Sequence, residues 1–233
     1  MKKTVIIPLA LLVSVALVCI LFKENIKNIG VSTTPTYSKP IIVIDAGHGG
    51  YDGGAVALDG TVEKDINLSI AKKLREFLFC AGFDVKMTRE TDESTDGSGT
   101  KKYAKTRDLN NRLKLMKENP ESIFVSIHLN KFTTSSANGA QVFYAPTAKT
   151  SDILAKCIQS SVVSLLQPEN TRTVKQGTKS IYILKNATVP SVIIECGFLS
   201  NREELEKLKN ENYQSMMAFS VFCGIIDYYN LTF

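Results

Sequence analysis

Three short apolar runs stand out in the pattern of hydrophobic and polar positions along the chain. They are Ile41–Ile44, Ile123–Ile127 and Ser191–Ile194. Each run is rich in β-branched residues and too short for a helix, which predicts a strand buried in a sheet. The first run gives way to glycines, which end a strand, and the third gives way to a carboxylate. A polar side chain therefore stands at or just beyond the end of each predicted strand.

Apolar residues recur at helical spacing in the longer segments between these strands. This periodicity predicts helices over Val62–Ala81, Thr106–Asn119, Ser151–Leu166, Arg202–Leu208 and Tyr213–Tyr229. Further short strands are predicted over Phe83–Thr88, Gln141–Tyr144 and Ile181–Leu184, and Arg89–Lys102 is polar enough for a surface loop. Strands that alternate with helices are typical of a single α/β domain with a mostly parallel central sheet flanked by helices.

The N-terminal segment differs from the rest because Thr4–Phe22 contains no charged residue and follows two lysines. A helix of this length would span roughly 28 Å, enough for a bilayer core. The terminal position, the lack of a polar face and the preceding lysines argue against a buried globular helix. No small-residue cleavage motif follows, which favours a retained anchor over a cleaved signal peptide. We therefore predict a signal-anchor over residues 1–28, a linker over 29–39 and a catalytic domain over 40–233. The lysines place the domain on the extracytoplasmic side of the membrane.

Charge and cysteine content exclude two classes of function. The net charge is +5, of which +3 comes from residues 1–30, so the domain carries only +2. That is far from the basic patch of a nucleic-acid-binding protein, and no nucleic-acid partner is expected. The five cysteines include no C-x-x-C pair, which argues against a cysteine-ligated zinc site and against a disulfide framework.

The two histidines of the chain, His48 and His128, both stand at the ends of predicted strands. The carboxyl ends of parallel strands meet at one edge of a sheet, where ligands bind. Two histidines and one carboxylate with a fourth position open form a known catalytic zinc set. Glu63 opens the first predicted helix and is a candidate third ligand, although a carboxylate there also interacts favourably with the helix dipole.

Glu195 ends a wholly apolar strand, where a carboxylate is costly to bury without a partner. Beside a zinc-activated water it would act as general base and pass the proton to the leaving nitrogen. Cys196 is a weaker candidate because strand alternation directs it to the opposite face. Asp45 could be a ligand, but its place within the strand end favours a partner role for a histidine ring.

Several motifs together resemble the zinc-dependent N-acetylmuramoyl-L-alanine amidases of the type 3 group. These motifs are Ile44–Gly50, Glu63–Leu68, Thr88–Arg89, Asn111–Arg112, Ser126–Asn130 and Glu195–Asn201, and the resemblance covers about residues 40–230. It implies one zinc ion per chain, held by His48, Glu63 and His128, with Glu195 as the catalytic carboxylate. It also implies hydrolysis of the amide between the lactyl group of N-acetylmuramic acid and L-alanine of the stem peptide.

The resemblance extends to Asn130, Arg89 and Arg112, which would contact substrate. The two arginines would either hold peptide carboxylates or brace loops. Length and the N-terminal segment are most similar to germination-specific members from endospore formers, which act in muramic-δ-lactam formation in the spore cortex. The implied partners are peptidoglycan strands, the membrane and an accessory activating protein.

Three alternatives stay open at this point. They are a vegetative cell-wall amidase, a zinc peptidase or deacetylase with another target, and a non-catalytic wall-binding module. The last is disfavoured because all four zinc and base residues are present.

Overall fold

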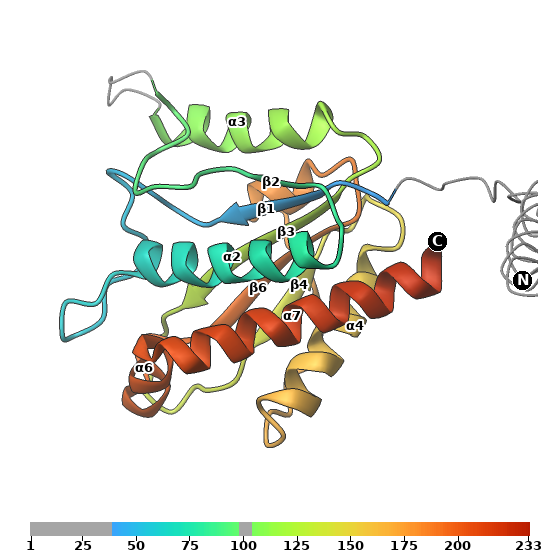
Figure 1. Cartoon of the computed structure of the whole chain (residues 1–233). Coiled ribbons are helices and arrows are strands. Elements are labelled where there is room, and N and C mark those ends of the chain that lie inside the picture. The colour runs from blue at the N-terminus through green and yellow to red at the C-terminus, as the bar shows by residue number, and fades with distance from the viewer. Residues whose placement is uncertain (1–38, 98–103) are drawn as a thin grey trace, which may run out of the picture. The chain divides into compact units, whose positions relative to one another are not determined.

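The computed structural model describes residues 39–97 and 104–233 (Figure 1). The predicted anchor and all but the last residue of the predicted linker lie outside these residues. Lys39–Phe233 form one compact unit. Within the described ranges, no helix combines the length and the hydropathy needed to cross a bilayer.

A mostly parallel sheet of six strands forms the centre of the domain, as predicted. The strands are β1 (Ile42–Ala46), β2 (Val85–Met87), β3 (Ile123–Asn130), β4 (Gln141–Tyr144), β5 (Lys175–Gln176) and β6 (Ser191–Phe198). Their order across the sheet is β2-β1-β3-β6-β4-β5. Strands β2, β1, β3 and β6 run parallel, whereas β4 pairs antiparallel with β6 and carries β5 in its own direction.

Helices cover both faces of this sheet (Figure 1). They are α2 (Glu63–Cys80), α3 (Ala104–Lys117), α4 (Ser151–Leu165), α5 (Tyr182–Lys185), α6 (Arg202–Lys209) and α7 (Glu211–Thr232). The alternation of side chains along β1 sorts the core into two clusters. Ile42 and Ile44 pack with α2, α4 and α7, whereas Val43 packs with α3 and α5.

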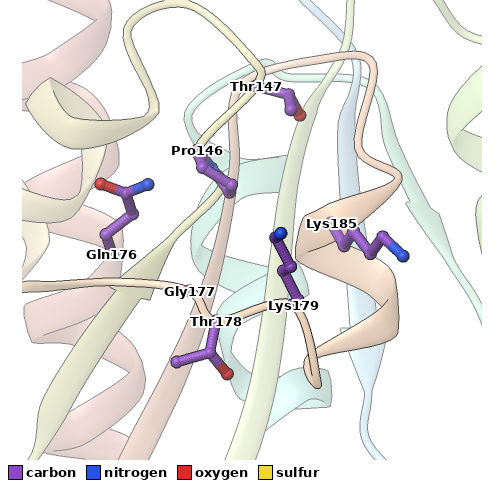
Figure 2. A pocket seen from close by; sticks show the side chains of 7 residues that line it. All are labelled: Pro146, Thr147, Gln176, Gly177, Thr178, Lys179 and Lys185. Atoms are coloured by element: carbon purple, nitrogen blue, oxygen red, sulfur yellow. The ribbon is translucent and has the colours of Figure 1, made fainter.

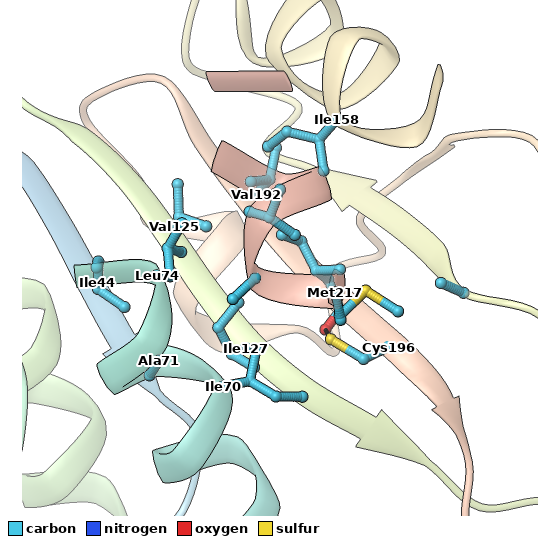
Figure 3. Packing of buried hydrophobic residues seen from close by; sticks show 14 of the residues in the cluster. Ile44, Ile70, Ala71, Leu74, Val125, Ile127, Ile158, Val192, Cys196 and Met217 are labelled. Atoms are coloured by element: carbon cyan, nitrogen blue, oxygen red, sulfur yellow. Dashed lines mark hydrogen bonds between the residues drawn. The ribbon is translucent and has the colours of Figure 1, made fainter. Parts of the chain in front are cut away.

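The larger cluster is formed by residues that lie far apart in the sequence (Figure 3). Ile70 and Leu74 from α2 and Met217 from α7 lie against Ile127 and Val192 of the central strands, and all five are fully buried. A core of this size fixes the strand ends that carry the candidate site.

The prediction of a strand over Ile181–Leu184 is wrong, because Tyr182–Lys185 form the short helix α5. Four apolar residues in a row fit a strand or a buried helical turn equally, and here Ile183 and Leu184 fill the cluster beneath α3. Strand β5 was not predicted, since Lys175 and Gln176 are polar and exposed. The longer helices were predicted to within three residues at each end.

Candidate metal centre

The parallel register brings the predicted site residues to one edge and one face of the sheet. Asp45 on β1 lies opposite Ser126 on β3, and His128 on β3 lies opposite Glu195 on β6. Residues two apart on a strand share a face, so these side chains stand on the side covered by α3 and α5. The side chains at the three strand ends therefore lie together, and their joint role as one site stays a prediction.

Glu63 joins the two histidines into a triangle of possible metal ligands. Its Oε1 lies 3.2 Å from Nε2 of His48 and 3.0 Å from Nδ1 of His128. One ligand atom from each of the three residues lies within 4.8 Å of the others. Ligands of a tetrahedral zinc ion stand roughly 3.3 Å apart, which follows from metal–ligand bonds of about 2.0–2.1 Å. Two imidazoles and one carboxylate at this spacing fit zinc.

Glu63 is buried and is held by the backbone as well as by the histidines. Its Oε2 accepts a hydrogen bond from the Ala55 amide at 2.8 Å, and its Oε1 accepts one from the Leu129 amide at 3.0 Å. Burial favours the neutral acid, but hydrogen bonds and charge from His128 and His48 outweigh it and hold the pKa of Glu63 well below its usual range. The carboxylate therefore stays ionised, as a metal ligand must.

His48 lies in a loop whose backbone is left-handed at this residue, with φ of 62°. Such conformations in residues other than glycine often occur at functional sites. Its Nδ1 lies 3.0 Å from Oδ2 of Asp52, as an ion pair rather than a well-directed hydrogen bond. Burial lowers the pKa of His48, but Asp52 and Glu63 outweigh that effect and raise it to about 9. Strong affinity for a proton reflects a negative potential that also favours a divalent cation.

The interpretation of Asp45 as a histidine partner is wrong, and Asp52 takes that place. Asp45 instead accepts hydrogen bonds from Ser126, Thr88 and Arg112. Sequence reasoning missed Asp52, although a carboxylate four residues after His48 in a glycine-rich loop was an available signal. The carboxylate that contacts the His48 ring could not be identified without the fold of that loop.

Two glycines leave the space that the ligands occupy. A Cβ at Gly47 would stand 2.4 Å from the His128 ring. A Cβ at Gly54, where φ is +70°, would stand 2.5 Å from Oε2 of Glu63 and 2.6 Å from the His48 ring. The close approach of backbone to ligand explains why the loop is rich in glycine.

Glu195 completes the site from the neighbouring strand. Its Oε2 is buried and has no hydrogen-bond partner. Burial raises the pKa of Glu195 above its ordinary value, although the nearby histidines oppose the shift. Cys196 faces the opposite core cluster, where burial raises the pKa of its thiol, so it is no candidate nucleophile.

Arg89 braces the loop that carries His48. It is buried, and its guanidinium donates to the backbone carbonyls of Ala46, Gly47, Lys64 and Thr91. With so many donors directed at backbone oxygens, the guanidinium serves the loop rather than a peptide carboxylate.

Arg112 has a similar place on α3. It donates to the carboxylates of Asp45 and Asp108 and to the carbonyl of His48 at 2.7 Å. The geometry of both arginines thus supports the bracing alternative. Asn130 lies partly buried at the end of β3, and substrate contact by this residue stays a prediction.

A cavity of about 220 Å³ opens beside the two histidines. Its other walls come from α3 and the α5 region, including Leu109, Tyr182 and Ile183. Tyr182 also donates from its hydroxyl to Oδ1 of Asn110 on α3 at 2.9 Å, which ties the two walls together. A larger cavity of about 580 Å³ lies elsewhere, beyond the end of β4, and contains none of the predicted site residues (Figure 2).

Comparison with known proteins agrees with this geometry. The family model described as N-acetylmuramoyl-L-alanine amidase matches residues 42–227. The germination-specific N-acetylmuramoyl-L-alanine amidase of Bacillus subtilis is 39% identical over 194 residues, which are 82% of this chain and 81% of that protein.

Two solved structures, one from Clostridioides difficile and one from Clostridium difficile 630, are similar throughout the domain. The CwlD amidase, solved in complex with the GerS lipoprotein, has a TM-score of 0.79 and 42% identity and covers 82% of this chain and 99% of its own. An N-acetylmuramoyl-L-alanine amidase has a TM-score of 0.72 and 30% identity and covers 84% of this chain and 100% of its own. Because the family model covers most of the chain and the structural likeness spans the same residues, this protein belongs to the N-acetylmuramoyl-L-alanine amidase family.

Proposed function

We propose that this chain is a zinc-dependent hydrolase that cleaves the amide between N-acetylmuramic acid and L-alanine of the peptidoglycan stem peptide. The observation that carries the proposal is the buried, unpartnered Oε2 of Glu195 on the strand beside His128. A free carboxylate oxygen next to two imidazoles and an ionised Glu63 is suited to proton transfer at a metal centre.

His48, Glu63 and His128 would hold the ion, and Asp52 would orient the His48 ring from its other nitrogen. A zinc ion there would supply a Lewis acid that polarises the scissile carbonyl and lowers the pKa of a bound water to about 7. Arg89 and Arg112 would keep the loop in place while substrate binds.

Glu195 performs the proton transfers in this proposal. In its ionised form it accepts a proton from the attacking water through the free Oε2. It then donates that proton to the nitrogen of L-alanine, so that the C–N bond breaks and the peptide leaves as an amine. The burial that raises the pKa of Glu195 helps it to hold the proton between the two steps.

The relatives and the N-terminal sequence support proposals about the process, the partner and the location of the enzyme in the cell. The Bacillus subtilis relative is a germination-specific amidase, so we place the activity in formation of muramic-δ-lactam in the spore cortex. Because the C. difficile relative was solved with a lipoprotein, we propose an accessory activating protein here as well. The apolar segment Thr4–Phe22 would anchor the enzyme to the membrane with its domain on the extracytoplasmic face.

Digestion of purified peptidoglycan tests the reaction. The purified protein should release new N-terminal L-alanine without new reducing sugar ends, and a chelator should stop the release. Release of free D-alanine or of free acetate would instead identify a carboxypeptidase or a deacetylase. A deletion strain that lacks cortex muramic-δ-lactam supports the spore role, whereas a defect in cell separation alone favours the vegetative alternative.

A further inference from the structure

An exposed aromatic ring stands beyond the end of the strand that carries His128. Phe132 follows His128 by four residues, and 48% of its surface is exposed. The position lies at most about 14 Å from His128 along an extended chain. Ligand sites in proteins are lined largely by hydrophobic and aromatic side chains.

The ring is fixed from below by two further side chains. It packs edge-to-face on Phe198, with ring centroids 4.9 Å apart at 65°. Phe198 is buried, and the guanidinium of Arg172 lies 4.6 Å from its ring centroid. Arg172 is in turn held by the carbonyl of Asn138 and by Oε1 of Gln141. The stack gives Phe132 a supported inner edge, while part of the ring stays open to solvent.

The backbone around Phe132 is tied to both neighbouring loops. Its amide donates to Oγ of Ser200 at 3.1 Å, and Nζ of Lys131 donates to the carbonyl of Val56 at 2.8 Å. A ring held this firmly loses little conformational entropy when a ligand packs on it.

A polar cleft of about 450 Å³ lies near the same elements. Asn138, whose carbonyl holds Arg172, lines it, as does Asn201, which follows Ser200 in the sequence. Its volume lies in the range of small-ligand sites, about 300–1,000 Å³. Its walls include seven amide and carboxylate side chains, namely Asn138, Gln167, Glu169, Asn170, Asn201, Glu203 and Glu204. Gln167, Asn170, Asn201 and Glu204 already hydrogen-bond within the protein. The exposed carboxylates of Glu169 and Glu203 match the hydroxyl and acetamido groups of sugars in hydrogen-bonding capacity.

We propose that Phe132 is a saccharide platform, on which an N-acetylhexosamine unit of the glycan strand stacks while the muramic unit lies at His48 and Glu195. The C–H face of a pyranose packs on an aromatic ring through dispersion and weak C–H contacts. The polar cleft then receives the next part of the strand. The proposal rests on the proposed function, which supplies the glycan.

A kinetic comparison of two substrates tests the platform in the full-length protein. Phe132→Ala should raise KM for long peptide-bearing glycan strands about two- to tenfold with kcat unchanged, because it removes binding common to ground and transition states. KM for a single muramoyl peptide, which lacks neighbouring sugars, should not change. Phe132→Tyr should restore the wild-type values.

The control is Phe79→Ala. Phe79 is another exposed phenylalanine, near the end of α2 that lies away from Glu63, and its substitution should change KM for neither substrate.

Equal effects of Phe132→Ala on both substrates would overturn the proposal and indicate a structural role. Unchanged KM for both would overturn it as well.

A binding measurement decides the question independently of catalysis. The chain contains no tryptophan, so Phe132→Trp creates a single fluorescent reporter at the platform. Titration with peptide-free N-acetylglucosamine oligomers should shift its emission to saturation, whereas Phe79→Trp should not respond. No response from Phe132→Trp, or equal responses from both variants, would overturn the platform. A failure of wild-type protein to release L-alanine would count against the proposed function, and the titration would still decide the saccharide site.

Discussion

Glu63 and Glu195 show how one residue type takes two roles within a single site. Glu63 is surrounded by donors, namely the backbone amides of Ala55 and Leu129 and both histidines. Its charge is therefore stabilised and its lone pairs are directed at fixed positions. Glu195 lies in the same pocket of the sheet edge but has a buried oxygen without a donor. The first environment suits a metal ligand, and the second suits a group that gains and loses a proton.

The contrast predicts different consequences of the same substitution. Glu195→Gln keeps the size of the side chain but removes its basic oxygen, so the variant should retain one zinc per chain while turnover falls by about 10²–10⁴. Glu63→Gln weakens a ligand, so metal and activity should be lost together, with partial recovery in excess zinc. Metal analysis of both variants and an assay on peptide-bearing glycan check this. Loss of zinc in Glu195→Gln with retention in Glu63→Gln would require the two roles to be exchanged.

The placement of individual site residues could be predicted only in part. His48, His128 and Glu195 were identified because each stands at or just beyond a strand end, which is a local pattern. Asp52 and the true partners of Asp45 depend on how a glycine-rich loop folds back onto the sheet, and no local periodicity encodes that path. The close approaches at Gly47 and Gly54 have the same origin, since they arise from tertiary contacts with side chains far along the chain.

Helix α3 is joined to the candidate metal centre through one buried ion-pair network. Arg112 on α3 contacts Asp45 at the end of β1 and Asp108 one helical turn before it. Burial raises the pKa of Asp45, but Arg112 and the hydroxyls of Ser126 and Thr88 outweigh it and hold that pKa below its ordinary value. The network therefore contributes to stability in the ionised form.

The sign of this shift predicts how stability depends on pH. A carboxyl with a lowered pKa in the folded state stabilises the fold above the unfolded pKa of about 3.9, and this contribution is lost as the pH falls further. Asp45→Asn should cost about 3–5 kcal/mol of unfolding free energy at pH 7, because it leaves the buried Arg112 without its charge partner. The gap between wild type and variant should narrow as the pH falls below 4.

Denaturant unfolding at pH 7 and at pH 3 measures that gap. The exposed Asp84→Asn is the matched control and should change stability by no more than about 0.5 kcal/mol at either pH. A gap that stays constant down to pH 3 would contradict the role assigned to Asp45.

At the scale of elements, helices were easier to predict than strand pairings. The amphipathic period of α2 and α4 is long enough to define a buried face, whereas Ile181–Leu184 is a run of apolar residues without a period. The antiparallel direction of β4 was not readable either, because strand direction follows from the path of the connecting loop. Because Ile181–Leu184 became the helical wall of the cavity beside the histidines, that cavity could not be predicted.

For the whole molecule, the sheet determines where the candidate site and the start of the described domain lie. The four parallel strands β2, β1, β3 and β6 bring their carboxyl ends to one edge, which collects His128 and Glu195 in direct register. The described domain begins at Lys39, next to the opposite edge, where β1 starts. The edge that carries the candidate site is therefore not the edge at which the described part of the chain begins.

The last prediction concerns the membrane anchor that we propose for the N-terminal segment. Thr4–Phe22 has no charged residue and no cleavage motif, so the native protein should stay in the membrane fraction at full-length mass, with its domain digestible by protease added from outside. Val13→Arg places a charge at the centre of the apolar run, where insertion costs roughly 2.5–3.5 kcal/mol, and should reduce membrane recovery. Ser32→Arg lies in the polar linker and should leave membrane recovery of the protein unchanged.

A mature form that begins near residues 24–30 would show that the segment is a cleaved signal peptide. In that case Val13→Arg would block export and processing rather than release a full-length enzyme from the membrane.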